Sequence, residues 1–482
     1  MKKKIILIDP RAEYVSSALQ IPDCEIALMV IDNHKVHKGL SKEITDRVKN
    51  FYFIHPLSQT DFEEMNASDF DLTYDEIWKH RSTHLKVGQY LERELYDSSS
   101  IQYRYYTALR YFLSFFENNQ IDVVLSVHME HGAVWDSLIL DLAVSKGIPA
   151  YSISVTSTNM NTVLWNFVDV AQRKLVSLKG VDKKHIDVDS YYALLGKYTS
   201  IYKKKKSCIR QALQNIKSYG AYMLNAFQYM FTGGISYTAK DKRKDRYTNV
   251  ETLPRAEKYR NYIYVQKLRK FYQKLAEPAD YSEKFIYYPL HQEPEASIMV
   301  RTPLSNQLWI IKCISESLPE GWTLYVKEHP SVFNIYDRFP VFYKRIDYHR
   351  HWSFYTQIKK FKNVKLIDLR ESPEELVKQS SAVNSICGTQ LTEAVLQQKP
   401  IIVWSKGLIC AEYLHDAFNI ESEEQLKKAL QIIAQGDFTP DYADLGAVIN
   451  EYAFEGMRYM ADGGDQTTSD KINILQHVIH RM

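Results

Sequence analysis

The chain has 482 residues, of which 45% are hydrophobic and 25% are charged, and its formal net charge at pH 7 is +3. This composition excludes a disordered chain, and the length favours two domains over one. The first nine residues contain only four consecutive apolar positions, which is too short for the core of a secretion signal and predicts a strand instead. No run approaches the roughly 18 apolar residues of a membrane-spanning helix.

The five cysteines are scattered along the chain and form no Cys-x-x-Cys pair that could combine with histidines in a zinc site. This pattern predicts a reducing, cytoplasmic setting and no structural zinc.

Residues 1–200 are predicted to form an α/β domain of Rossmann-like type, because short apolar runs alternate with helical patterns. The strands are expected at 5–8, 26–31, 123–127 and 151–155. Helical patterns at 105–116 and 136–146 would cover the parallel sheet.

Residues 201–282 lose this alternation and are predicted to be a linker or a helical insertion. Between Lys203 and Lys274 there are 18 lysines and arginines against four acidic residues, so the rest of the chain is net negative. The stretch is interpreted as a solvated helical face, a nucleic-acid patch or a contact with anionic lipid. We favour anionic lipid over nucleic acid, because aromatic residues and methionines lie beside the lysines.

Residues 283–450 are predicted to form a second Rossmann-like domain, followed by a helical segment at 451–482. The strands are expected at 285–290, 323–326, 364–367, 382–386 and 401–404, and the helices at 303–318, 373–379 and 389–398. The chain would then be an α/β protein with two Rossmann-like domains facing each other across a cleft.

The turn at 385–393 joins a predicted strand to a predicted helix and carries groups suited to an anion. Gly388 lets a ligand approach the backbone, and the helix aims free N–H groups at the space above the strand. Thr389 can donate its hydroxyl, Glu393 can accept from ribose hydroxyls, and Ser385 stands at the strand end. The alternative is a plain turn with Thr389 as the N-cap.

A second cluster closes the strand at 323–326. The alternation of an extended chain puts Lys327 and His329 on one side, and Pro330 stops the strand. Lys327 and His329 together could bind a phosphate or a nucleobase, although a surface strand end with a satisfied histidine is the alternative.

A third cluster, which closes the strand at 285–290, holds His291 and the carboxylates Glu293 and Glu295. Such a loop can position a substrate hydroxyl or act as an acid or base, or it can be an exposed turn.

Read from the N-terminal to the C-terminal one, the three clusters resemble the capsule polysaccharide biosynthesis glycosyltransferases, a bacterial family that includes transferases of Kdo and related sugars. The likeness spans about residues 285–419 and adds Arg350, which precedes a Phe-Tyr pair. The resemblance implies a GT-B fold, synthesis of a surface polysaccharide, and contact of the His-Pro pair and the Gly-Thr turn with a sugar nucleotide. The matching positions are Pro289 to Glu295, Val326 to Pro330, Arg350 with Phe354 and Tyr355, Asn363 with Val364, Gly388 with Thr389 and Glu393, and Lys399 with Pro400.

The substrate that accepts the sugar is expected to bind after the strand at 123–127. A base at this place must deprotonate the hydroxyl group of that acceptor. We assign Glu130, then His131, then Asp136 to this role. The alternative is that Asp136 caps its helix.

No histidine cluster indicates a metal, and no other cofactor is expected. We therefore predict a cytoplasmic, metal-independent glycosyltransferase, peripheral at the membrane, that moves Kdo or another acidic sugar from a CMP donor. The partners would be the donor, a glycan or lipid-linked glycan and an anionic membrane surface, with no nucleic acid. The alternatives are a teichoic-type polyol-phosphate transferase with a CDP donor and a non-catalytic glycan-binding or assembly subunit.

Overall fold

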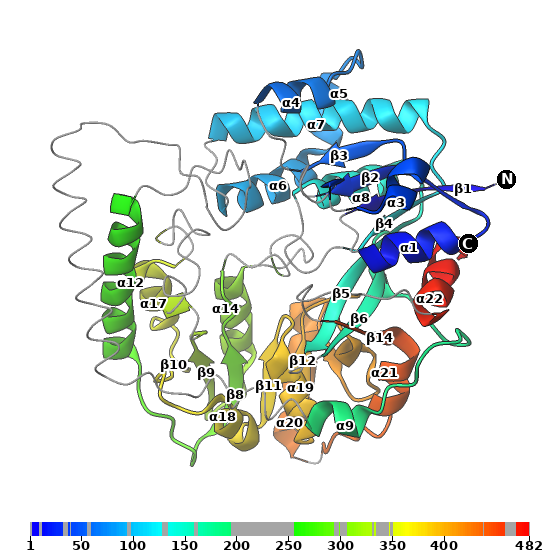
Figure 1. The fold of residues 1–482 in the computed structure, drawn as a ribbon. Helices are drawn as coiled ribbons and strands as arrows, with labels where there is room; N and C mark the ends of the chain where they lie inside the picture. Colours follow the sequence, from blue (N-terminus) through cyan, green and yellow to red (C-terminus); the bar gives the residue numbers. More distant parts are fainter. Residues whose placement is uncertain are drawn as a thin grey trace, which may run out of the picture.

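The computed structural model contains two α/β units, each built on one sheet (Figure 1). It describes residues 2–8, 12–31, 37–38, 40–54, 59–93, 98–127, 134–158, 162–193, 255–293, 298, 306–329, 332–333, 347, 350–436, 438–457 and 469–481.

The first sheet has the strand order β14-β6-β5-β4-β1-β2-β3, with β7 paired to β6. The run from β5 to β3 is parallel, whereas β6 pairs antiparallel with β5, β7 and β14. The strands are β1 (Lys3–Ile8), β2 (Cys24–Ile31), β3 (Phe51–Phe53), β4 (Val123–Ser126), β5 (Ala150–Thr158), β6 (Thr162–Asp169), β7 (Lys174–Leu175) and β14 (Ala453–Met457). The four strands expected in this region are confirmed.

Helices cover both faces of this sheet, because the buried runs of its central strands present apolar side chains to both sides. In β1, Ile5 and Leu7 face one core, while Ile6 and Ile8 face the other. The helices are α1 (Ala12–Gln20), α3 (Lys42–Arg47), α4 (Gln59–Met65), α5 (Tyr74–Lys79), α6 (Arg81–Arg93), α7 (Ser98–Asn118), α8 (Val134–Ser145) and α22 (Ser469–His480). Helix α9 (Val188–Ala193) instead packs on the second unit, where Tyr191 and Tyr192 join its core (Figure 1).

The second sheet is parallel throughout, with the order β10-β9-β8-β11-β12-β13. Its strands are β8 (Lys284–Pro289), β9 (Trp322–Lys327), β10 (Val364–Leu366), β11 (Ala382–Ser385), β12 (Ile401–Val403) and β13 (Phe418–Asn419). Read along the sheet, the order is 3-2-1-4-5-6, the dinucleotide-binding arrangement. All five strands expected here are confirmed.

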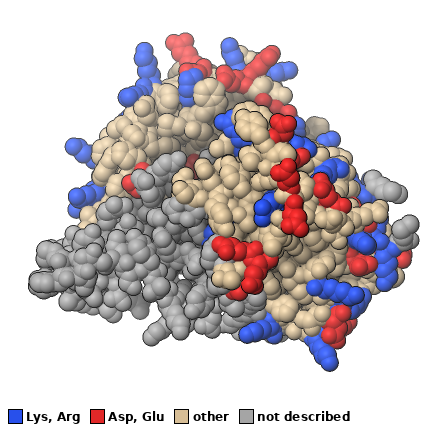
Figure 2. Space-filling model, turned by 90° about the horizontal axis from the view of Figure 1, so that it is seen from above, with Lys and Arg blue, Asp and Glu red and all other residues tan. Residues whose placement is uncertain are grey.

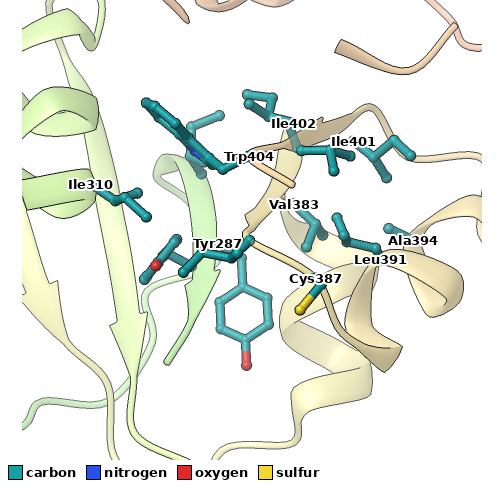
Figure 3. Packing of buried hydrophobic residues seen from close by; sticks show 14 of the residues in the cluster. Tyr287, Ile310, Val383, Cys387, Leu391, Ala394, Ile401, Ile402 and Trp404 are labelled. Carbon is teal, nitrogen blue, oxygen red and sulfur yellow. The ribbon is translucent and has the colours of Figure 1, made fainter. Parts of the chain in front are cut away.

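The helices of the second unit pack on this sheet and at its edge. They are α12 (Arg255–Leu275), α14 (Gln307–Ser317), α17 (Trp352–Ile358), α18 (Pro373–Gln379), α19 (Thr389–Leu396), the 3₁₀ turn η1 (Cys410–Tyr413), α20 (Glu423–Gln435) and α21 (Leu445–Tyr452). Figure 3 shows Leu391 and Ala394 of α19 close to Val383 of β11 in the core.

The end of the chain returns to the first unit. The segment expected to be wholly helical, 451–482, contains β14, which joins the first sheet beside β6, and α22, which packs beside α1 (Figure 1). Two Rossmann-like units in one chain, with this return, form a GT-B type architecture. On the face seen in Figure 2, basic and acidic side chains of the described residues are interspersed.

The two units also meet directly. The amide of Leu175 donates to the Tyr413 hydroxyl at 2.7 Å, and Asn166 donates to the Leu408 carbonyl at 3.3 Å. A Cβ on Gly407 would lie only 2.4 Å from the backbone of Arg173, so only glycine fits at this contact.

Candidate functional site

The carboxyl ends of β8, β9 and β11 lie side by side in the second sheet. Pro289 pairs with Lys327, and Tyr287 of β8 pairs with Val383 of β11. Because parallel strands end at the same edge, the three clusters predicted from the sequence start at one place.

His291 joins the first of these clusters to the third. Its backbone is fixed by Gln307 of α14, whose Oε1 accepts from the His291 amide at 2.6 Å and whose Nε2 donates to the His291 carbonyl at 3.1 Å. The imidazole Nε2 lies 3.0 Å from the Ser385 hydroxyl, and His291 is 9% exposed. The side chain is therefore held at the end of β11.

Gly388 shapes the turn between β11 and α19. Its φ of 148° and ψ of 165° belong to a region that only glycine adopts readily, and it is the N-cap of α19, with no side-chain cap. Thr389 is therefore exposed as the first helical residue and is not the N-cap. The helix begins with backbone N–H groups that no side chain caps, which is the arrangement that binds anions.

Glu393 lies one turn along α19 and is half-buried. Burial, followed by the charge of Glu393, raises the pKa of Tyr287 on β8, so the carboxylate lies close to this strand.

Lys327 ends β9 and is only 2% exposed. No acidic side chain in the described part of the chain lies within ion-pairing distance of it, and nearby Asp368 is bound by Arg370. Burial lowers the pKa of Lys327 to about 8, although the charges of Glu328 and Asp368 act in the opposite direction. A buried ammonium without a bound carboxylate is suited to an anionic ligand.

Glu328 points to the other side of the strand, as the alternation predicts, and enters a buried network. Its carboxylate accepts from Arg350 Nε at 2.8 Å, from the Tyr355 hydroxyl at 2.7 Å and from the His329 amide at 2.8 Å. Burial raises the pKa of Glu328 and lowers that of Arg350. Three donors on one carboxylate are nevertheless the pattern of an ionised group, so we assign an ion pair.

Arg350 is fully buried and acts beneath the site. Besides Glu328, its guanidinium donates to the His291 carbonyl at 2.6 Å and to the carboxylate of Glu293, and it lies 4.4 Å from the centroid of the Phe354 ring. It therefore connects the loop of His291 and Glu293 to the end of β9 and does not line the binding surface.

Of the remaining residues predicted for this site, His329 is half-buried and its amide is held by Glu328. Glu295 and Pro330 lie outside the described residues. Gln307 was not predicted, and Tyr355 was named only as part of the Phe-Tyr pair of the resemblance, because the roles of both residues depend on distant partners, His291 and Glu328.

In the first unit, Asp136 is buried in the first turn of α8, and the Ser126 hydroxyl donates to its carboxylate at 3.5 Å. Ser126 is the last residue of β4, so Asp136 lies at the carboxyl edge of the first sheet. Glu130 and His131 lie outside the described residues.

Within the described ranges, no group of three His, Cys, Asp or Glu side chains could hold a metal ion. Nor does any helix in those ranges have the length and apolar character needed to cross a membrane.

No family model and no curated protein sequence matches the chain. Among solved structures, UDP-GlcNAc 2-epimerase from Methanocaldococcus jannaschii is 12% identical, covering 92% of this chain and 95% of that chain, with a TM-score of 0.26. The KpsC beta Kdo 2,7 transferase of Thermosulfurimonas dismutans is 12% identical, covering 75% and 89%, with a TM-score of 0.28. The KpsC beta Kdo 2,4 transferase of the same organism is 10% identical, covering 74% and 87%, with a TM-score of 0.26. Such low TM-scores carry no argument, and the fold assignment rests on strand order and register.

Proposed function

We propose that the chain is a glycosyltransferase that binds a nucleotide-activated sugar at the carboxyl edge of the second sheet. One observation carries the proposal. Lys327, which is buried and has no acidic partner among the described residues, ends the strand next to that of His291, and α19 begins at the same edge. The leaving nucleotide of a sugar transfer is an anion, so it supplies the counter-charge that Lys327 lacks.

The favoured donor is CMP-activated Kdo or another acidic sugar, and the product is a bacterial surface polysaccharide, as the resemblance implies. His291, His329 and Thr389 would contact the nucleotide, and Glu393 would accept from its ribose. Protein cations and the helix N-terminus stabilise the leaving group in this proposal, so no metal is required.

The acceptor hydroxyl needs a base on the first unit. Asp136 is the described candidate, because its carboxylate lies at the carboxyl edge of that sheet. Glu130 and His131 precede it in the same connection and remain proposals.

A peripheral position at an anionic membrane fits the same enzyme. Helix α12 buries Leu268 and Tyr272 and exposes Lys267, Lys270 and Lys274 on its opposite face. Surface lysines of this kind are attracted to anionic lipid at low ionic strength. Equal pelleting with neutral and anionic vesicles, or unchanged pelleting after all three lysines are replaced by glutamine, would exclude this contact.

Thermal unfolding with a panel of nucleotides tests the main proposal, since a ligand that binds only the folded state raises Tm. The panel contains CMP-Kdo, CMP-sialic acid, CDP-glycerol and UDP-GlcNAc. We expect a CMP-sugar to raise Tm for the wild type and for Lys312→Met, an exposed control on α14, but not for Lys327→Met. A response to CDP-glycerol alone identifies the polyol-phosphate alternative, and no response to any nucleotide identifies the non-catalytic one.

A further inference from the structure

A hollow lined mainly by polar side chains lies between α22 and the loop that follows β7. Its residues are separate from those of the proposed donor site. It has a volume of about 660 Å³ and opens widely to solvent. Its polar lining consists of Asp182, Asn473, Gln476, His477, His480 and Arg481.

The side chains on α22 follow the helical repeat, since positions 473, 476, 477 and 480 fall on one face. Two of them are fixed by the opposite loop. Asn473 donates to the Asp182 carbonyl at 2.9 Å, and His477 Nε2 lies 2.9 Å from the Ser177 carbonyl. A carbonyl can only accept, so Nε2 carries the proton and the ring is held in one orientation.

In this lining, one nitrogen of Arg481 lacks a hydrogen-bond acceptor. Its Nη1 is buried and has no hydrogen-bond partner in the described part of the chain. The one acid of the lining, Asp182, is exposed, and no ion pair joins it to Arg481 among the described residues. A buried N–H without an acceptor is unfavourable, and an anion in the hollow would provide one.

We propose that this hollow binds the phosphate group of a small phosphorylated metabolite, with Arg481 as the principal contact. A planar guanidinium beside the His480 imidazole and a side-chain amide, Gln476, offers several donors to an acceptor-rich group. The hollow is within the size range of small-molecule sites. A bound phosphate bridges α22 and the Gly180–Asp182 loop and holds the end of the chain on the first unit.

Calorimetric titration with pyrophosphate at constant ionic strength tests this site. The titration uses full-length Lys327→Met, because that variant removes the proposed donor-phosphate contact. We expect saturable binding that weakens by about tenfold to a hundredfold when Arg481→Gln is added, the loss typical of a charge-assisted contact. Arg481→Lys should retain part of the affinity, and Lys312→Met on α14, which is outside the lining, should change it little.

Absence of binding at millimolar pyrophosphate, or equal affinity with and without Arg481, overturns the proposal. Binding of citrate without binding of pyrophosphate overturns the phosphate assignment. Circular dichroism of each variant establishes that the fold is retained, and Arg481→Lys provides the comparison if Arg481→Gln does not fold.

Discussion

The Nε2 atom of His291 lies 3.0 Å from the hydroxyl oxygen of Ser385, which is 94 residues further along the chain. This contact joins the loop after β8 to the end of β11, and the Arg350 guanidinium holds the carbonyl of the same histidine from below. The residues proposed to bind the sugar nucleotide are therefore held in position by a buried ion-pair network. The network itself does not line the binding surface.

Removing the centre of this network should destabilise the protein strongly. Arg350→Met leaves the carboxylates of Glu328 and Glu293 without their guanidinium, and we expect a loss of about 3–5 kcal/mol in the free energy of unfolding. Urea unfolding followed by tryptophan fluorescence measures this loss.

Arg370→Met is the matched control, because Arg370 also pairs with a carboxylate, that of Asp368, but its side chain is 85% exposed. An exposed pair contributes about 1 kcal/mol or less. Similar losses in the two variants would mean that the Arg350 network is not a buried ion pair.

Lys327→Met should weaken nucleotide binding and leave the fold at least as stable at pH 7. The methionine matches the length of the lysine side chain without its desolvated charge. We expect nucleotide affinity to fall by about tenfold to a hundredfold. A parallel loss of stability would indicate that Lys327 has a structural partner.

The pH dependence of stability follows from the lowered pKa of Lys327. Between pH 8 and the pKa of 10.5 expected for an unfolded lysine, the unfolded chain binds more protons than the folded one. The free energy of unfolding of the wild type should therefore rise across this window relative to that of Lys327→Met. Below pH 8 the difference between the two free energies should be constant. Nucleotide affinity of the wild type should fall above pH 8. Parallel stability curves for the two proteins would contradict the lowered pKa.

Turnover should continue in EDTA, because the groups proposed to stabilise the leaving nucleotide belong to the protein. Donor hydrolysis measured with and without EDTA tests this. Loss of activity that a divalent ion restores would refute this account of the donor site.

Nine of the parallel strands, β1, β2, β4, β5 and β8 to β12, were predictable because their buried runs are apolar, whereas the short strands β3 and β13 were not predicted. The same patterns could not reveal β6 and β14, whose antiparallel pairing joins residues almost 300 positions apart. Such pairing depends on contacts across the fold rather than on local periodicity.

Within the site, alternation along β9 predicted that Glu328 lies on the side of the strand opposite Lys327 and His329. It could not show that Arg350 is buried against Glu328, because a lone arginine in a sequence is normally exposed. The N-cap was also ambiguous, since Thr389 is a good capping residue, whereas the backbone angles of Gly388 put the glycine at that position.

Gly388→Ala should destabilise the second unit by about 1–3 kcal/mol, because its backbone angles strain any residue with a Cβ. The space itself is adequate, since the nearest atom of His291 would lie 3.5 Å from the new carbon. Gly446→Ala in α21 is the control. It has open space and no positive φ, and we expect a gain of about 0.4–1 kcal/mol. Equal effects of the two changes on the thermal midpoint would contradict backbone strain at Gly388.

Asp136→Asn should lower kcat by about a hundredfold or more if this carboxylate deprotonates the acceptor, because the amide keeps the shape of the side chain but cannot take a proton. The Tm shift caused by the donor should not change, since the donor surface belongs to the second unit. Asp141→Asn on the same helix is the control. Asp141 accepts from the Thr83 hydroxyl and lies 3.9 Å from Lys86, so its loss should affect stability and not kcat. If Asp136→Asn retains full kcat while Glu130→Gln or His131→Ala abolishes it, the base is one of those two residues. Asp136 would then have only a structural role in the first turn of α8.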